Sequence, residues 1–271
     1  MDNTSSAKTF DEIVHHRRSV RIYDTSVPFD STAVTRSLKR AHLAPNSSNL
    51  QLWEFYQVKS PEKKAELAKY CLGQPAATTA NELVVIVTRK DLWQKRVDFM
   101  LRVVKKGFEK EDSDAAKKAE AANQNTKDTG NVLQKMANDK EARRKGVLQY
   151  YGKLIPQLYK GGVFAGWIKK LYVQLFMAPK KPSYREVGYH DTRIIAHKSA
   201  ALAAQTFMLS MAAEGYDTCP MEGMDSARIK KLLGLPKGAE INMVIGCGTR
   251  KPEGVYGPRV RVANEKVIFE V

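Results

Sequence analysis

The hydrophobic positions along the chain follow two periods, and together they predict a few strands interleaved with many helices. Residues 53–58 alternate apolar and polar side chains, which favours a strand. Residues 83–87 are a continuous apolar run, which favours a buried strand, and 241–245, apolar except for Asn242, is read the same way. A weaker strand is expected at 267–271. This mixture, with no alternation of single strands and helices, predicts an α+β layered domain.

Helices are predicted from capping residues and from apolar positions at helical spacing. Thr9 to Glu12 form a capping-box pattern for a short helix toward Arg17, and Asp30 can cap a second helix. Ser60 followed by Pro61 starts a third helix, which should run to about residue 70. Further along, helices are expected over 91–108, 109–130, 132–154 and 156–177, where 109–130 is either an exposed helix or a mobile loop.

The strongest helical pattern runs from 192 to 214 and is apolar almost all round. It is rich in alanine, so we expect a central, closely packed helix that ends at Gly215. Between the strand at 83–87 and this helix lies a basic stretch, about 95–185, which is expected to be a helical insertion. The chain is therefore predicted to form a single domain, 1–271, with that insertion.

Composition narrows the class of protein. The 271 residues suffice for a full hydrophobic core, and 43% hydrophobic with 27% charged side chains is ordinary for a soluble globular protein. The polar N-terminus does not resemble a signal peptide, and the longest apolar run is broken by Lys169 and Lys170, so no membrane span is expected. Three cysteines without CxxC spacing indicate free thiols in a reducing compartment, which predicts a cytoplasmic location.

The net charge of +16 is concentrated in the middle of the chain. Residues 95–185 hold 21 Lys and Arg against 9 Asp and Glu, a net charge of +12. A basic surface favours anionic partners such as nucleic acid, membrane headgroups and phosphorylated cofactors. The alternative is a solvated, lysine-rich helical insertion with no particular partner.

A cluster of arginines stands at the end of the first predicted helix. Arg17, Arg18 and Arg21 lie there with Ser19. Guanidinium groups bind phosphate through paired hydrogen bonds, and the serine hydroxyl adds another donor. The alternative is a basic surface cluster that complements the dipole at the helix C-terminus.

About 25 residues further on, the run APNSSNLQLW presents a series of amides and hydroxyls. The groups can both donate and accept hydrogen bonds, and they belong to Asn46, Ser47, Ser48, Asn49 and Gln51. Such groups can recognise the polar rim of a heterocycle, and with the arginines they suit a phosphorylated heterocycle. The alternative is an ordinary loop before a strand, with Pro45 and Asn46 as turn formers.

Two more segments can carry chemistry. Pro220 to Gly223 are expected to form a tight loop with exposed backbone amides, where Gly223 lets a flat ring approach closely. The alternative for this segment is a connection between helices. Near the C-terminus, Arg259 and Arg261 are two residues apart and point the same way in an extended chain, either as a phosphate clamp or as a basic tail.

The order and spacing of these motifs resemble the nitroreductase family of flavin enzymes. The motifs are RRSxR, then APxSxNxQxW, then GxxxxPxEG after an alanine-rich helix, and finally a strand ending in IGxG before PxxR. The resemblance covers about residues 10–90 and 190–271, and the middle matches no pattern. It implies a layered α+β fold in which helices flank a central, mostly antiparallel or mixed β-sheet.

The resemblance also implies which residues bind FMN. The phosphate and ribityl chain would be held by Arg17, Arg18, Ser19 and Arg21, with Arg259 and Arg261 returning to the phosphate. Further flavin contacts would come from Pro45, Asn46, Ser47, Asn49 and Gln51. The isoalloxazine ring would lie against Pro220, Met221, Glu222 and Gly223, with the amide of Gln74 over the flavin.

The family forms homodimers with FMN at the subunit interface, so the resemblance implies that the loop 46–51 and the arginines come partly from different chains. The apolar helix before Gly215 needs more cover than one small domain gives, and the strand at 267–271 is expected to reach across to the partner. Two departures stand out, since Asn46 replaces the usual serine and Leu52 the usual proline. The insertion lies in the region that covers the substrate in the family, so the resemblance does not indicate which substrate is used.

The activity implied by the resemblance is transfer of hydride from NADH or NADPH, through flavin N5, to a small electrophile such as a nitroaromatic, quinone or enone. The flavin carries this chemistry, so no catalytic side chain is expected. The five histidines are not spaced as metal ligands, and no metal is expected. Alternatives are other reductive flavin chemistry, such as dehalogenation or enoyl reduction, and a basic nucleic-acid-binding protein. Against the last, aromatic residues are not interleaved with the basic ones as stacking platforms require.

Overall fold

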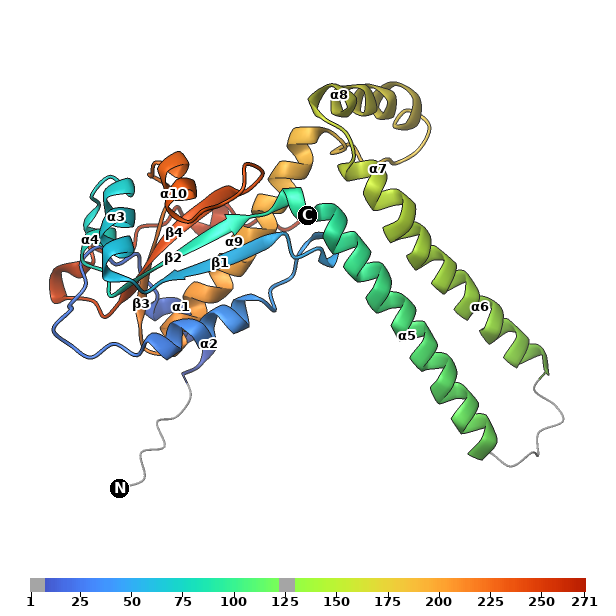
Figure 1. Ribbon diagram of the computed structural model, residues 1–271, viewed down its shortest axis with the longest axis horizontal. Coiled ribbons are helices and arrows are strands. Elements are labelled where there is room, and N and C mark those ends of the chain that lie inside the picture. Colours follow the sequence, from blue (N-terminus) through green and yellow to red (C-terminus); the bar gives the residue numbers. More distant parts are fainter. Residues whose placement is uncertain (1–7, 122–129) are drawn as a thin grey trace.

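The computed structural model describes residues 8–121 and 130–271, and its centre is an antiparallel sheet (Figure 1). The strands β1 (Trp53–Val58), β2 (Glu82–Thr88), β3 (Asp217–Met221) and β4 (Glu240–Gly248) are arranged in the order β1-β2-β4-β3. The prediction of an α+β layered fold is confirmed. Three predicted strands are present, whereas β3 falls in a segment that was expected to be a loop or a helix connection.

Strand β2 is buried along its whole length, which explains its unbroken apolar sequence. Val85 packs on one side of the sheet with Leu67 and Ile229, and Val84 packs on the other side with Phe207. A register shift between Ile86 and Val87 interrupts its pairing with β4. The sheet therefore has a hydrophobic layer on each face.

The predicted central helix is present as α9 (Tyr189–Ala213), which lies across one face of the sheet beside α2 (Ser31–Ala41). Its Ala200, Ala203, Ala204 and Phe207 are fully buried, so the small residues bring the helix close to the strands. The helix begins three residues before the predicted start. Gly215 follows it with φ of +87°, the left-handed conformation that a glycine tolerates.

The opposite face is covered by α3 (Pro61–Tyr70), α4 (Pro75–Thr78) and α10 (Ser226–Leu232). The predicted capping serine of α3 is confirmed, because Ser60 Oγ accepts a hydrogen bond from the Lys63 amide at 3.3 Å. Helix α1 (Phe10–His16) has both hydrogen bonds of the predicted capping box between Thr9 and Glu12. The short helices α4 and α10 had no separate signal in the sequence.

A long helical hairpin extends away from the sheet (Figure 1). It consists of α5 (Trp93–Ala121) and α6 (Gly130–Gln149), followed by a π-turn (Tyr150–Leu154) and α7 (Ile155–Tyr159). The charged part of α5 pairs with α6, since Lys140 lies 2.8 Å from Asp112 and Arg144 lies 2.8 Å from Glu111. The predicted segment 109–130 is thus helical up to Ala121, and residues 122–129 lie outside the described part of the chain.

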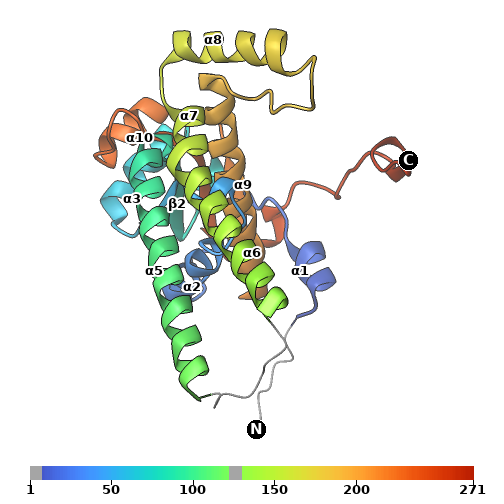
Figure 2. The ribbon, with the colours of Figure 1, turned by 90° about the vertical axis from the view of Figure 1, so that its right-hand side faces the viewer.

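The predicted helix over 156–177 is broken into two. The chain leaves α7 at Lys160, turns at Gly161 with φ of +100°, and starts α8 (Val163–Tyr172), which continues as a π-turn (Val173–Met177). Figure 2 shows α8 lying across one end of the molecule. In the described ranges, no helix is both long and apolar enough to cross a membrane.

The prediction of a strand at 267–271 is wrong. After β4 the chain passes through short 3₁₀ turns, Pro252–Gly254 and Asn264–Lys266, and the last residues form no strand. Val267, Ile268 and Phe269 are exposed. Among the described residues, this β-prone segment takes part in none of the strand pairings.

Candidate functional site

The arginine-rich segment after α1 runs alongside the edge strand β3. Ser19 pairs with Thr218 in a parallel bridge, and the Val20 amide donates to the Thr218 carbonyl at 3.2 Å. Val20 and Tyr23 are buried, and the Tyr23 hydroxyl donates to the Gly246 carbonyl at 3.0 Å. Because Val20 points into the core, its neighbours on either side are left facing the surface.

The C-terminal tail crosses this segment and is fixed to it by two arginines. The Arg259 guanidinium donates to the carbonyl oxygens of Val14, His15 and Arg17, at 3.2, 3.1 and 2.6 Å. These carbonyls lie at the end of α1, so Arg259 caps that helix. In the opposite direction, Arg18 donates to the Gly257 carbonyl at 2.8 Å.

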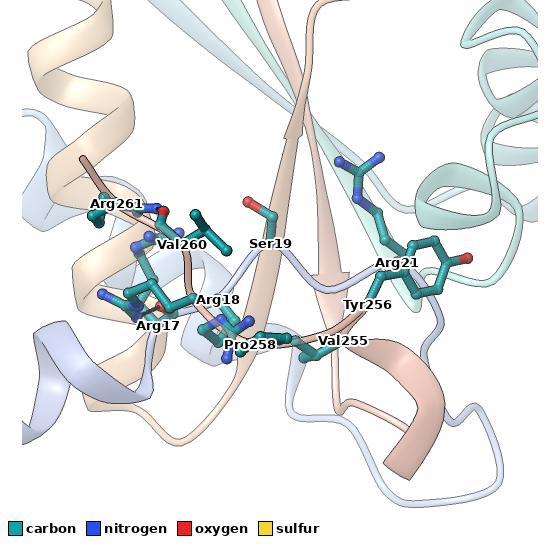
Figure 3. Close-up of a pocket in the computed structure, with 10 residues that line it drawn as sticks. Arg17, Arg18, Ser19, Arg21, Val255, Tyr256, Pro258, Val260 and Arg261 are labelled. Carbon is teal, nitrogen blue, oxygen red and sulfur yellow. Dashed lines mark hydrogen bonds between the residues drawn. The ribbon is translucent and has the colours of Figure 1, made fainter.

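Between these two segments lies a cavity of about 220 Å³ (Figure 3). It is lined by Arg17, Arg18, Ser19, Arg21, Val255, Tyr256, Pro258, Arg259, Val260 and Arg261. Arg17, Arg18 and Arg261 gather on one side of Ser19 in Figure 3, and Arg21 lies on the other side, beside Tyr256. We call this the arginine pocket. The structure thus brings together the two arginine motifs from opposite ends of the sequence.

The electrostatics of the arginine pocket favour an anion. Five of its ten lining residues are arginines, and none is acidic. Burial lowers the pKa of Arg17, and the positive charges of Arg259, Arg261 and Arg18 lower it further. Like charges this close repel one another, so a negatively charged group in the pocket would relieve the repulsion.

The segment 220–223 differs from the prediction of a single tight loop. Pro220 and Met221 belong to β3, and Met221 is buried in the core, so only Glu222 and Gly223 are exposed loop residues. Gln74 donates through Nε2 to the Gly223 carbonyl at 2.7 Å and to the Cys71 carbonyl at 3.0 Å. The structure therefore places the predicted Gln74 directly against the end of this segment.

The loop that begins at Pro45 is held mainly by its own side chains. Asn46 Oδ1 accepts a hydrogen bond from the backbone N–H of Gln51 at 2.8 Å, and Gln51 Nε2 of the side chain donates to the Asn49 carbonyl at 3.1 Å. Asn49 and Gln51 have positive φ angles, near +50°, which is uncommon outside glycine. The Ser47 amide donates to Ser199 Oγ of α9 at 3.3 Å. None of these residues lines the arginine pocket, so a single chain does not bring the two groups together.

An ionic contact next to the segment that carries Arg17 had no signal in the sequence. Asp217, at the start of β3, is only 4% exposed and accepts from the Arg250 amide at 3.0 Å and from Arg250 Nε at 2.9 Å. Arg250 also donates to the His16 carbonyl at 2.9 Å. Burial lowers the pKa of His16, and the charge of Arg250 lowers it further. The Asp217–Arg250 pair thus ties β3 to the segment that carries Arg17.

The cysteines and histidines add no second site within the described residues. Cys71, Cys219 and Cys247 are buried free thiols, as predicted, and burial raises the pKa of Cys71 to about 11. Such thiols are poor nucleophiles at neutral pH. No group of three or more metal-ligating side chains occurs in the part of the chain that the structure describes.

The protein is thus an α+β protein with an antiparallel sheet and an arginine-lined cavity beside its edge strand β3. The sequence model described as the nitroreductase family matches residues 14–249. The chain therefore belongs to the nitroreductase family, which confirms the resemblance carried by its motifs.

Three relatives illustrate the match. MhqN of Bacillus subtilis, a candidate NAD(P)H nitroreductase, is 21% identical over 244 residues, which are 90% of each chain. A crystal structure of a nitroreductase candidate from Exiguobacterium sibiricum in complex with FMN has a TM-score of 0.60 at 23% identity, covering 99% of this chain and 100% of the other. CLA-ER, an enone reductase of gut-bacterial fatty acid saturation, has a TM-score of 0.61 at 18% identity and full coverage of both chains.

Proposed function

We propose that this protein is an FMN-dependent NAD(P)H oxidoreductase that reduces a small electrophile such as a nitroaromatic, a quinone or an enone. The observation that carries the proposal is the arginine pocket, whose ten lining residues include five arginines and no acidic side chain. Membership of the nitroreductase family supports it, as does the FMN bound to the related structure from Exiguobacterium sibiricum.

The residues of the arginine pocket fit the phosphate end of FMN. Guanidinium groups of Arg17, Arg18 and Arg261 and the hydroxyl of Ser19 form a donor set suited to a phosphate dianion. Arg259 contributes positive charge, but its hydrogen bonds already cap α1, so we assign it mainly to positioning the segment that carries Arg17. When bound, FMN supplies hydride transfer from NADH or NADPH, through N5, to the acceptor.

The protein's own groups around the ring would position it. The amide of Gln74 fixes the Gly223 carbonyl, and through it the backbone turn at the end of β3. A Cβ at Gly223 would lie 3.4 Å from Gln74 Nε2, so the two residues are in direct contact at this turn. We propose that this turn, with Pro220 to Glu222, forms the wall against which the isoalloxazine lies.

We further propose a homodimer in which the loop of Pro45, Asn46, Ser47, Asn49 and Gln51 in one protomer faces the arginine pocket of its partner. The support is that neither the loop nor the pocket reaches the other within one chain. The exposed C-terminal residues 267–269, apolar and without a strand partner, are suited to lie on the second protomer.

The test of the phosphate assignment is the double substitution Arg18→Ala with Arg261→Ala. Two charge-assisted contacts to one phosphate are lost, which should weaken FMN binding by roughly a hundredfold or more. Fluorescence titration of apoprotein with FMN measures this change. Arg96→Ala with Arg102→Ala, on α5 and outside the pocket, is the matched control and should leave the affinity unchanged. Stoichiometric, tightly held flavin in the pocket variant would refute the assignment.

The acceptor is the second part of the test. The reduced protein should be titrated without oxygen against nitroaromatics, quinones and enones, and the structural similarity to an enone reductase supports including enones. Bleaching of the flavin by NADH or NADPH is expected first. If neither donor bleaches the bound flavin, a same-fold enzyme with other reductive chemistry, such as dehalogenation, becomes the better assignment.

A further inference from the structure

Helix α8 and the π-turn after it span Val163 to Met177. The side of this segment that packs against the rest of the protein carries few large side chains. Gly166 and Val173 are buried on that side, and Ala165, Lys169 and Met177 lie half-buried beside them. A Cβ on Gly166 would come within 2.5 Å of the Tyr189 amide nitrogen, so only glycine allows this approach. The inward side therefore offers little apolar area to the rest of the protein.

The large apolar residues of α8 point to solvent instead. They are between 40 and 74% exposed and repeat in pairs at each helical turn: Val163, Phe164, Trp167, Ile168, Leu171, Tyr172, Leu175 and Phe176. We call these eight residues the α8 apolar face. An amphipathic helix of a globular protein normally turns such a stripe toward the core. A contiguous exposed stripe of this size marks a surface that binds something.

Two lysines hold the helix in this orientation. Lys169 donates to the carbonyl oxygens of Gln157 and Lys160, at 2.8 and 2.6 Å, and so caps the end of α7. Lys170 pairs with Asp191 at the start of α9, at 3.2 Å. Rotating the α8 apolar face inward would break both contacts, so its exposure is part of the fold and not a loose attachment.

The surroundings of the α8 apolar face are strongly basic. Residues 142–185 contain ten Lys and Arg and not one Asp or Glu. Lys160, Lys180, Lys181 and Arg185 flank the helix at its two ends and are exposed. Within the described residues none of these four forms a salt bridge. An apolar stripe bordered by free cations is a combined hydrophobic and electrostatic surface.

We propose that the α8 apolar face docks the protein on a bilayer that contains anionic phospholipids, with the helix lying in the plane of the interface. Tryptophan, tyrosine and phenylalanine on one face with lysines at the border is the composition of interfacial helices. A second copy docked on this face would add a second basic border to the first, whereas anionic headgroups complement Lys180, Lys181 and Arg185. Figures 1 and 2 show α8 at one end of the molecule, away from the sheet, where a flat surface can reach it.

Cosedimentation with phospholipid vesicles tests the proposal, and its readout does not depend on bound flavin. The full-length protein should pellet with vesicles of phosphatidylcholine and phosphatidylglycerol and stay in solution with phosphatidylcholine alone. High salt should weaken the binding, because the flanking charges are exposed. Equal partitioning onto neutral and anionic vesicles, or no binding to either, overturns the proposal.

Two pairs of substitutions separate the apolar and the charged contributions. Phe164→Ser with Phe176→Ser should weaken vesicle binding by roughly a hundredfold, because two phenylalanines no longer enter the interface. Lys180→Ser with Lys181→Ser should weaken it by roughly thirtyfold, and these exposed lysines keep the test usable if the first pair fails to fold. The matched control is Phe99→Ser with Val103→Ser, exposed apolar residues on α5, which should bind as the unchanged protein does.

The competing occupant, a second copy of the chain, has a different signature. If sedimentation velocity shows that the Phe164→Ser with Phe176→Ser protein loses an oligomer that the unchanged protein forms, while vesicles bind neither, the face is a contact between copies. That result would overturn the bilayer proposal and leave the FMN assignment untouched, since the arginine pocket is scored separately by flavin titration.

Discussion

Replacing Asp217 tests the ionic contact that holds the arginine pocket in position. Its carboxylate is 4% exposed and accepts hydrogen bonds from three donor groups of Arg250: the backbone amide, Nε and Nη2. Arg250 in turn holds the His16 carbonyl, one residue before Arg17. Asp217→Ala would therefore leave a guanidinium without its partner and loosen the segment that lines the pocket.

The magnitude follows from the burial of the two partners. Removing one partner of a buried ion pair costs about 3–5 kcal/mol. The Arg250 side chain is 29% exposed, so water can reach part of the freed guanidinium. We therefore expect Asp217→Ala to lower the free energy of unfolding by about 3 kcal/mol, at the lower end of that range. Asp217→Asn keeps one acceptor oxygen and should cost about half as much.

Urea unfolding followed by circular dichroism measures these changes, with Asp98→Ala as a control on an exposed carboxylate of α5. The control should shift stability by less than about 0.5 kcal/mol. FMN affinity should fall in Asp217→Ala beyond the control, because Arg17 is no longer anchored through His16. The reasoning is wrong if Asp217→Ala unfolds as the control does, or if it loses stability while FMN binding stays unchanged. A combined Asp217→Asn and Arg250→Met protein should be more stable than Asp217→Ala, since no unpaired charge remains.

Two further predictions concern the core and pH. Phe207→Ala, on α9 where the ring is fully buried against the sheet, should cost about 3–5 kcal/mol in thermal or urea unfolding, and Phe207→Leu less than about 1.5 kcal/mol. Burial lowers the pKa of Lys90 to about 8, below its unfolded value, so the unfolded chain binds more protons between the two values. Stability should therefore rise as pH increases from about 8 toward 10, and Lys90→Met should remove that rise. The measurement is the urea midpoint of the unchanged protein and of the Lys90→Met protein at pH 7.5 and at pH 9.5. The assignment to Lys90 is wrong if the midpoints of the two proteins change by the same amount between these pH values.

The parts of the fold that the sequence predicts are those whose burial and local pattern agree. Strand β2 is apolar throughout and buried on both faces, and α9 combines alanine-rich periodicity with a glycine at its end. Strand β3 fails this test, because its sequence DTCPM includes a proline and two polar residues. The buried carboxylate of Asp217 is paired with Arg250, 33 residues further along the chain, and a local pattern cannot reveal such a partner.

The terminal segment shows the reverse error. Residues 267–271 have β-prone side chains, but a strand needs a partner, and within the described residues this segment pairs with no strand. Likewise the apolar spacing over 156–177 is helical, yet Gly161 and Gly162 break it into α7 and α8. Within the candidate site, the two arginine motifs were predicted to converge and do line one cavity. The role of Arg259 as the cap of α1 depends on three carbonyls near residue 15, which no spacing rule indicates.

The arginine pocket is better explained by a ligand than by the stability of the fold. Burial and neighbouring positive charges both lower the pKa of Arg17, which means that the folded chain holds this charge at a cost. Two of the other arginines are stabilised by backbone carbonyls, Arg259 at the end of α1 and Arg18 at Gly257. None of the ten residues that line the pocket is acidic, so its positive charges are not neutralised there. A cluster with only a structural role would gain from one carboxylate, as Arg250 does from Asp217. Without such a carboxylate the charge of the cluster stays available, and the phosphate binding that we propose would stabilise the folded state by mass action.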